Sequence, residues 1–274
     1  MKYRFLKHIL PLVIISLVVA CDIIPEDSYL IPIENSSDSA DISKRVVLIE
    51  EFTGHRCNNC PKAAEEVKKL QLIYGDKLIV MALHTGQLSN PYPPDFITNY
   101  RTPEGNEIFN HFNISAIPIG MVNRINYGGS PLVNYGDWEP KIADIINRDA
   151  IVNVEFTREY NSDNRSLSIN VKTQFIGDEA LPTKLCAFIT ESGMISPQSY
   201  GTEVVYDYVH NHVLRTSFEE SGTWGIELIG IGAETNSLNV TLKDNWVAEN
   251  CEIIVYVYNT QTMEILQAAI HHVK

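Results

Sequence analysis

The feature that most constrains this sequence of 274 residues is an apolar run that leads directly into two closely spaced cysteines. The run Val46–Phe52 has the near-continuous apolar character of a strand buried on both faces. A short loop then carries Cys57 and Cys60, and Pro61 opens a segment in which apolar side chains recur near helical spacing. At a helix N-terminus, unpaired backbone N–H groups and the helix dipole favour a thiolate. The pattern therefore predicts a redox-active dithiol at a strand-to-helix turn.

The pattern of residues 45–150 predicts an α/β domain built around this turn. A helix is expected from Pro61 to about Tyr74, followed by a second buried strand at Leu78–Leu83. A strand, a helix and a strand in this order imply a right-handed parallel crossover. The elements expected after a proline-rich insertion at Thr85–Pro94 are helical turns near Asp95–Tyr100 and Pro103–Phe112, a strand after Pro118, and a helix at about Trp138–Asn147.

This order of elements resembles the thioredoxin fold at three separated places. The first is the Cys57-x-x-Cys60 turn, and the second is Ile117-Pro118, which resembles the cis-proline that faces the dithiol in that fold. The third is Glu51, six residues before Cys57, where thioredoxins carry a buried acid. A Cys-x-x-Cys also occurs in zinc sites, but the sequence has no second pair at zinc-finger spacing.

The residues around the dithiol depart from the thioredoxin pattern. Thioredoxins have Trp before the first cysteine and Gly-Pro between the two, whereas this chain has Arg56 before Cys57 and Asn58-Asn59 between the pair. The reduction potential therefore does not follow from the resemblance. Arg56 and His55 are expected to lower the pKa of Cys57, which would raise its thiolate fraction and make the disulfide more oxidising.

Residues 151–274 change to short segments with alternating apolar and polar residues. Several such strands with little helix predict an all-β sandwich of the immunoglobulin-like type, with a domain boundary near Ala150. The strands are expected at Val152–Phe156, Leu167–Val171, Lys184–Ile189, Leu238–Leu242 and Ile253–Tyr258.

Two pairs of residues in this half have alternative interpretations. Cys186 and Cys251 lie in or beside strands, and they either pair as a disulfide or remain two buried thiols. On a strand, His210 and His212 would face the same side, which makes them weak candidates for metal ligands. No third ligand follows from spacing, and the alternative is that the imidazoles bond to loop carbonyls. The sequence predicts no cofactor.

The N-terminal segment predicts export and lipidation. Residues 1–20 combine a basic start with a short apolar core, as secretory signal peptides do, and Val18-Val19-Ala20-Cys21 resembles the lipobox of bacterial lipoproteins. The alternative is an ordinary signal peptide that leaves Cys21 as a free thiol. Residues 21–44 have the composition of a linker, here a lipidated tether. The formal net charge of −13 argues against nucleic acid as a partner.

The chain as a whole resembles the outer-membrane lipoproteins related to the 28-kDa outer membrane protein of certain Gram-negative gut and oral bacteria. The matching parts are the lipobox at Cys21, Glu51–Pro61, His210–Arg215 and Val255–Asn259. The resemblance implies a thioredoxin-like domain followed by a β-sandwich and a lipid anchor in the outer membrane. It does not supply a substrate.

Two functions are compatible with these features. In a thiol–disulfide oxidoreductase of the cell envelope, Cys57 would be nearest solvent and would attack envelope proteins or a redox partner, and Cys60 would resolve the mixed disulfide. Glu51 would accept the proton of Cys60, and Pro118 would present a backbone edge to the substrate. Alternatively, the chain is a surface binding or adhesion lipoprotein in which Cys57–Cys60 is a structural disulfide.

Overall fold

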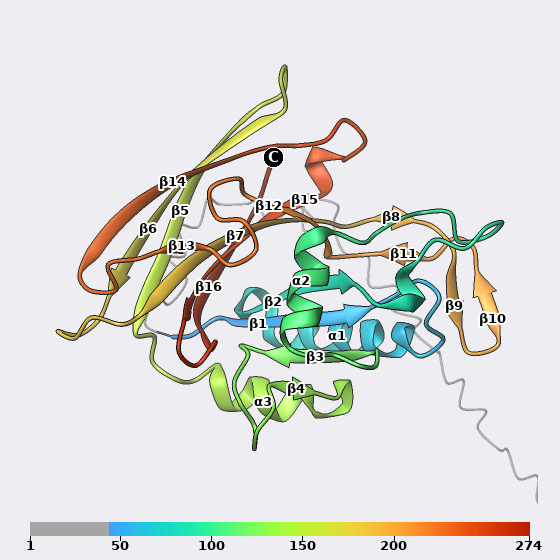
Figure 1. The fold of residues 1–274 in the computed structure, drawn as a ribbon, viewed down its shortest axis with the longest axis horizontal. Coiled ribbons are helices and arrows are strands. Elements are labelled where there is room, and N and C mark those ends of the chain that lie inside the picture. The colour runs from blue at the N-terminus through green and yellow to red at the C-terminus, as the bar shows by residue number, and fades with distance from the viewer. Residues whose placement is uncertain (1–43) are drawn as a thin grey trace, which may run out of the picture. The chain divides into compact units, whose positions relative to one another are not determined.

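In the computed structural model, which describes residues 44–274, the dithiol segment folds into a strand, a loop and a helix (Figure 1). Strand β1 (Val47–Thr53) is buried along its whole length, and helix α1 (Cys60–Tyr74) follows the loop. Strand β2 (Leu78–His84) pairs with β1 in parallel, so the predicted parallel pairing of the two strands is confirmed. Pro61 lies in the first turn of α1, where its missing N–H costs no helical hydrogen bond.

The rest of the N-terminal part extends this sheet and covers both of its faces. Strand β3 (Ile119–Val122) pairs antiparallel with β1, and β4 (Leu132–Val133) pairs antiparallel with β3. Helix α3 (Trp138–Ile145) shares a core with α1 on one face. Helix α2 (Pro103–His111) packs through Ile108 on the other face.

The helical turn predicted near Asp95–Tyr100 is wrong. This segment has no regular structure beyond a bridge in which Tyr92 and Phe96 exchange backbone hydrogen bonds of 2.6 and 3.1 Å. Pro93 and Pro94 precede it, and proline lacks an N–H and restricts the residue before it. The backbone groups that a helix needs are therefore missing or already used.

The C-terminal part consists of strands, and the five predicted strands are all present. The strands of this part are β5 (Val152–Asn161), β6 (Ser166–Phe175), β7 (Thr183–Glu191), β8 (Met194–Ile195), β9 (Gln198–Tyr200), β10 (Glu203–Val205), β11 (Val209–His210), β12 (Val213–Ser217), β13 (Ile226–Glu227), β14 (Ala233–Thr241), β15 (Cys251–Asn259) and β16 (Ile265–His272).

One sheet runs through both parts of the chain. Its nine strands follow the order β16-β15-β7-β12-β2-β1-β3-β4, with β13 paired to β7 (Figure 1). The junction is a parallel contact of β12 with β2 at Val213 and Ala82, where the Ala82 N–H donates to the carbonyl of His212 over 2.8 Å. Strand β12 thereby covers an edge of β2 that would otherwise be open. The predicted boundary near Ala150 does not separate two sheets.

A second sheet, β14-β6-β5, packs on one face of β7, β15 and β16, and a large apolar core fills the space between them. Cys251 points into this core, whereas Cys186 points into the core on the opposite face of the large sheet. Side chains five residues apart on a strand face opposite sides, and Cys186 pairs with Tyr256, five residues after Cys251. Both cysteines are free and buried, so the interpretation as two separate thiols is confirmed.

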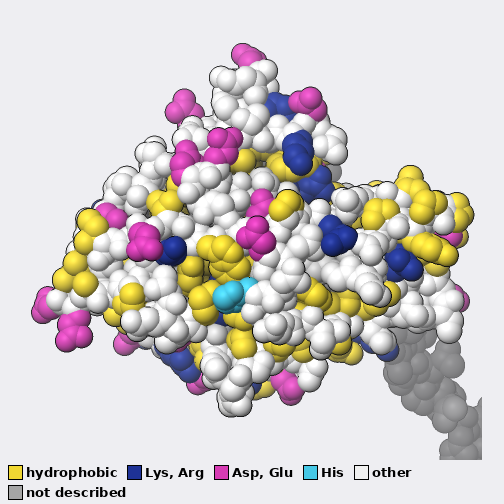
Figure 2. Space-filling model, in the orientation of Figure 1, with side chains coloured by type: hydrophobic (Ala, Val, Ile, Leu, Met, Phe, Trp, Pro, Cys, Tyr) yellow, Lys and Arg dark blue, Asp and Glu magenta, His cyan; other side chains and the backbone are white. Residues whose placement is uncertain are grey.

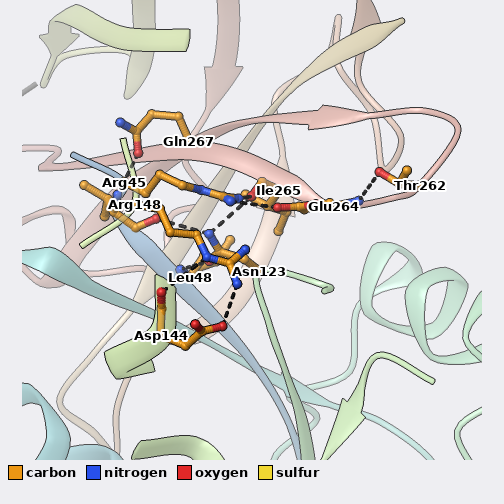
Figure 3. Close-up of polar contacts among 10 residues, drawn as sticks. Arg45, Leu48, Asn123, Asp144, Arg148, Thr262, Glu264, Ile265 and Gln267 are labelled. Atoms are coloured by element: carbon orange, nitrogen blue, oxygen red, sulfur yellow. Dashed lines mark hydrogen bonds and ion pairs between the residues drawn. The ribbon is translucent and has the colours of Figure 1, made fainter. Parts of the chain in front are cut away.

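A polar seam joins the start of β1 to β16 (Figure 3). The Asn123 carboxamide accepts from the N–H of Leu48 at 2.6 Å and donates to the carbonyl of Ile265 at 3.2 Å. Arg45 forms an ion pair of 2.7 Å with Glu264. The first and last strands of the described region are therefore fastened together by groups that lie more than 100 residues apart in sequence.

Candidate functional site

Cys57 and Cys60 form a disulfide at the start of α1, and both residues are only 2% exposed. Cys57 is expected to lie nearer solvent than Cys60, but the two have the same exposed fraction, and Asn58 and Asn59 occupy the exposed positions of the turn. The Ile117–Pro118 peptide bond is cis, and the Ile117 carbonyl oxygen lies 3.9 Å from Cys57 Sγ. Because Cys57 is buried, the residues around it would have to move before another thiol could reach its Sγ.

Glu51 lies on β1 with its carboxyl beneath α1 and is only 4% exposed. Its Oε1 has no hydrogen-bond partner among residues 44–274. Burial raises the pKa of Glu51 to about 8, so the carboxyl is protonated at neutral pH. Glu51 and Cys60 line a cavity of about 30 Å³, a volume that exceeds the roughly 10–15 Å³ required by one water.

The C-terminal part supplies several walls of this cavity. The lining residues besides Glu51 and Cys60 are Thr53, Ala64, Ala82, His84, Gln198, Tyr208, His210 and Asn211. The rings of His84 and His210 lie 5.6 Å apart, and the ring of Tyr100 lies 4.8 and 4.9 Å from them. Burial lowers the pKa of both histidines, so they are neutral at pH 7.

The two residues predicted to tune Cys57 lie in different surroundings. His55 is buried and stacks on Phe96 with ring centroids 5.5 Å apart. Burial lowers the pKa of His55, so at pH 7 its imidazole supplies no positive charge beside Cys57. The Arg56 guanidinium, a positive group, lies 4.5 Å from the ring centroid of Tyr92. Any electrostatic tuning therefore falls to Arg56.

The structure separates His210 from His212. His212 has a φ of +56°, which interrupts the extended backbone that would have placed the two side chains on one face. His210 is buried with Nε2 3.3 Å from the Ser196 carbonyl oxygen, whereas Nδ1 of His212 lies 3.6 Å from Glu252. Within residues 44–274, no group of three or more His, Cys, Asp or Glu side chains is arranged to hold a metal ion.

Residues 106–274 match the family model described as outer membrane protein Omp28. The chain belongs to the Omp28 family. No match is found among the curated proteins.

The solved structures that are similar to this Omp28 chain include two from Porphyromonas gingivalis. HBP35 of Porphyromonas gingivalis is 17% identical with a TM-score of 0.69, over 84% of this chain and 76% of that chain. A domain of the outer membrane lipoprotein Omp28 from Porphyromonas gingivalis is 22% identical with a TM-score of 0.35, over 46% of this chain and 89% of that chain. At these identities the first likeness shows the fold alone.

Membership in the Omp28 family places the protein at the outer membrane, as the sequence predicts. In the described residues, no helix has the length and apolar character needed to cross a membrane. The signal peptide, the lipidation site Cys21 and the tether up to residue 43 lie outside the described residues.

The sequence does not predict several of the residues that lie around the Cys57–Cys60 disulfide. Gln198 and Tyr208 come from the C-terminal part, about 140 residues beyond the cysteines, and His84 lies at the end of a strand. Nothing in their local sequence marks them, because their place at the cavity depends on how β12 docks on β2. The unusual His210–Arg215 segment is the one part of this region that the sequence marks, and it suggests metal ligands rather than a contact with the dithiol.

Proposed function

We propose that this Omp28 protein is an outer-membrane lipoprotein, anchored through lipid on Cys21, that carries out thiol–disulfide exchange on envelope proteins. The observation that carries the proposal is the buried Glu51, whose carboxyl shares a water-sized cavity with Cys60. A structural disulfide needs no such acid, and burial of a carboxyl without a partner destabilises the fold. A buried acid at this position has a role if Cys60 gains and loses a proton during the reaction.

The strand order supports a thioredoxin-like interpretation of residues 45–150. In the order β2-β1-β3-β4, β1 is parallel to β2 and antiparallel to β3, and the dithiol lies between β1 and α1. The two packed β layers of residues 151–274 likewise support a sandwich that shares its larger sheet with the N-terminal part. Fold by itself does not establish exchange activity.

The proposed reaction oxidises a client dithiol. A client thiolate attacks Cys57 Sγ, the Cys57–Cys60 bond breaks, and Cys60 leaves as a thiolate that takes a proton from Glu51 through a water in the cavity. The second client thiolate then attacks the client sulfur of the mixed disulfide, which releases the Cys57 thiolate and leaves a client disulfide. Because Glu51 is protonated below pH about 8, neutral pH favours donation of its proton to Cys60.

Exposed apolar side chains near the dithiol support a protein client. They gather at the right-hand end of the view in Figure 2, where the segment 88–97 and strands β8–β10 lie. The largest of them are Leu88, Tyr92, Ile97, Ile195 and Tyr206. The Leu88 carbonyl accepts from the N–H of Arg56, which fixes this surface beside the dithiol loop. Apolar patches of this kind mark surfaces that contact other proteins.

The 2% exposure of Cys57 favours a second candidate, a binding lipoprotein in which the disulfide is a permanent staple. In that case the apolar surface would bind a ligand, and the cysteines would only hold the start of α1. The two candidates differ in reduction potential, because structural disulfides lie below about −300 mV and exchange catalysts lie above about −270 mV.

The deciding experiment traps clients in envelope extracts. The exchange is reversible, and in the reverse direction Cys57 attacks a client disulfide and Cys60 then releases the client. Cys60→Ser cannot make this second attack, so we expect client proteins to accumulate on Cys57 as adducts that dithiothreitol releases. Cys57→Ser is the matched control and should trap far fewer. The proposal fails if Cys60→Ser traps nothing and the wild-type pair stays oxidised below about −300 mV in redox buffers.

A further inference from the structure

The hairpin β9–β10, from the C-terminal part of the chain, lies against the dithiol loop. Two of its backbone N–H groups donate to carbonyls of that loop: Ser199 to His55 at 2.8 Å and Gly201 to Asn58 at 3.0 Å. The hairpin also reaches α1, because the Tyr200 hydroxyl donates to Glu65 at 2.6 Å. The loop that holds the cysteines is therefore bonded to a segment about 140 residues away.

Gln198, the first residue of the hairpin, makes the closest side-chain contacts to the loop. Its Nε2 donates to the carbonyl of Cys57 at 3.0 Å and lies 3.3 Å from the carbonyl of Gly54. The same nitrogen lies 2.9 Å from the carbonyl of Ser199, so two N–H groups serve three oxygens. Gln198 is 3% exposed, and water cannot easily replace it as a donor to these carbonyls.

The opposite side of the loop is also held. The N–H of Arg56 donates to the carbonyl of Leu88 at 3.0 Å. A Cβ added at Gly54 would lie 2.7 Å from Ser89 Oγ and 2.9 Å from the Leu88 carbonyl, so only glycine fits this approach. The loop therefore lies between the segment 88–89 and the hairpin, and Gln198 supplies the side-chain donor on the hairpin side.

We propose that Gln198 is a positioning residue that fixes the dithiol loop and thereby sets the redox equilibrium of the Cys57–Cys60 pair. The inference rests on the proposed exchange function of that pair. Asn58 and Asn59 between the cysteines give the loop no proline to limit its conformations, so its order depends on contacts from outside. The hairpin supplies these contacts.

The direction of the effect follows from preorganisation. The two Cα atoms are 5.4 Å apart in the disulfide, and the bonds to Gln198 hold the loop in this arrangement. A reduced loop without these bonds would sample conformations in which the thiols are apart, which lowers their effective concentration toward each other. Loss of Gln198 should therefore favour the reduced form and speed attack on the sulfurs.

The test compares Gln198→Met with Tyr200→Phe in the full chain. Gln198→Met keeps side-chain length but removes the donors, whereas Tyr200→Phe removes a bond between the same hairpin and α1 and leaves the loop carbonyls bonded. Each protein is equilibrated with dithiothreitol redox buffers, its free thiols are counted by alkylation, and its rate of reduction is followed. We expect Gln198→Met to shift the equilibrium about tenfold toward the dithiol, about 30 mV for two electrons. Tyr200→Phe should remain within twofold of wild type.

The outcomes separate this inference from the proposed function. An unchanged equilibrium in Gln198→Met, or equal shifts in both variants, would overturn the role of the Gln198 carboxamide. If Gln198→Met does not fold by circular dichroism, Gln198→Asn keeps the amide on a shorter side chain, and its equilibrium should lie between wild type and a tenfold shift. A wild-type pair that resists all dithiothreitol buffers would contradict exchange, and the rates of reduction by a stronger reductant would then decide the role of Gln198.

Discussion

The single residue Glu51 makes the stability of the fold depend on pH. Its carboxyl is buried and its pKa is raised to about 8 by desolvation, compared with 4.5 for the exposed group. Between these two values the folded protein holds a proton that the unfolded chain has lost. The folded state is then favoured less and less as pH rises, with a slope of about 1.4 kcal/mol per pH unit.

We predict that Glu51→Gln removes the contribution of Glu51 to this pH dependence. Between pH 7 and 9, wild type should lose about 1–2 kcal/mol more unfolding free energy than Glu51→Gln does. Urea unfolding at both pH values provides the measurement. Other buried groups, such as the Cys186 and Cys251 thiols whose pKa burial raises to about 12, contribute equally in both proteins, so the difference between the two slopes reports Glu51. Equal slopes in the two proteins would show that Glu51 is ionised in the folded state at pH 7.

At the scale of elements, the other face of β1 carries a buried ion pair that joins three strands. Arg124, just after β3, donates to both oxygens of Glu50 on β1 at 2.5 and 2.6 Å. The same guanidinium donates to the hydroxyl of Tyr256 on β15 at 2.9 Å. The pair is fully buried, so each charge depends on its partner. This contact links the N-terminal strands to the C-terminal ones.

We predict that Arg124→Met destabilises the protein by about 3–5 kcal/mol, because it leaves the Glu50 carboxylate buried and unpaired. The double variant Glu50→Leu/Arg124→Met should recover much of this loss, since it removes both charges together. Urea unfolding of the single and double variants measures the difference. A double variant no more stable than Arg124→Met would contradict the idea that the unpaired Glu50 charge causes the loss.

The sequence predicts individual helices and strands better than it predicts how they pack together. Helix α1 and strands β5, β6, β7, β14 and β15 follow from local periodicity. Glu51 is singled out only through the resemblance to thioredoxins, and the cavity that it shares with Cys60 is not predicted. The pairing of β12 with β2 rests on a single register pair, Val213 with Ala82, and no local pattern reveals it. For that reason the contributions of Gln198 and His210 to the dithiol site could not be predicted.

At the scale of the whole molecule, the apolar cores show how the two parts depend on each other. One core lies entirely within residues 152–273, and another lies entirely within residues 47–146. The third combines both parts: Leu48, Phe52 and Met81 pack in the same cluster as Phe188 and Tyr256. A separate N-terminal domain would expose this shared cluster together with the edge of β2.

We therefore predict that residues 44–274 unfold in a single transition and that a fragment of residues 44–150 does not fold alone. The fragment keeps α1, α3 and their core but exposes half of the shared cluster, so it should lack a cooperative thermal transition and should aggregate. Circular dichroism and calorimetry of both proteins provide the measurement, with added residues 151–274 as a control for rescue in trans. Two separate transitions in the longer protein, or a monomeric fragment with cooperative unfolding, would restore the boundary near Ala150 between two independently folding parts.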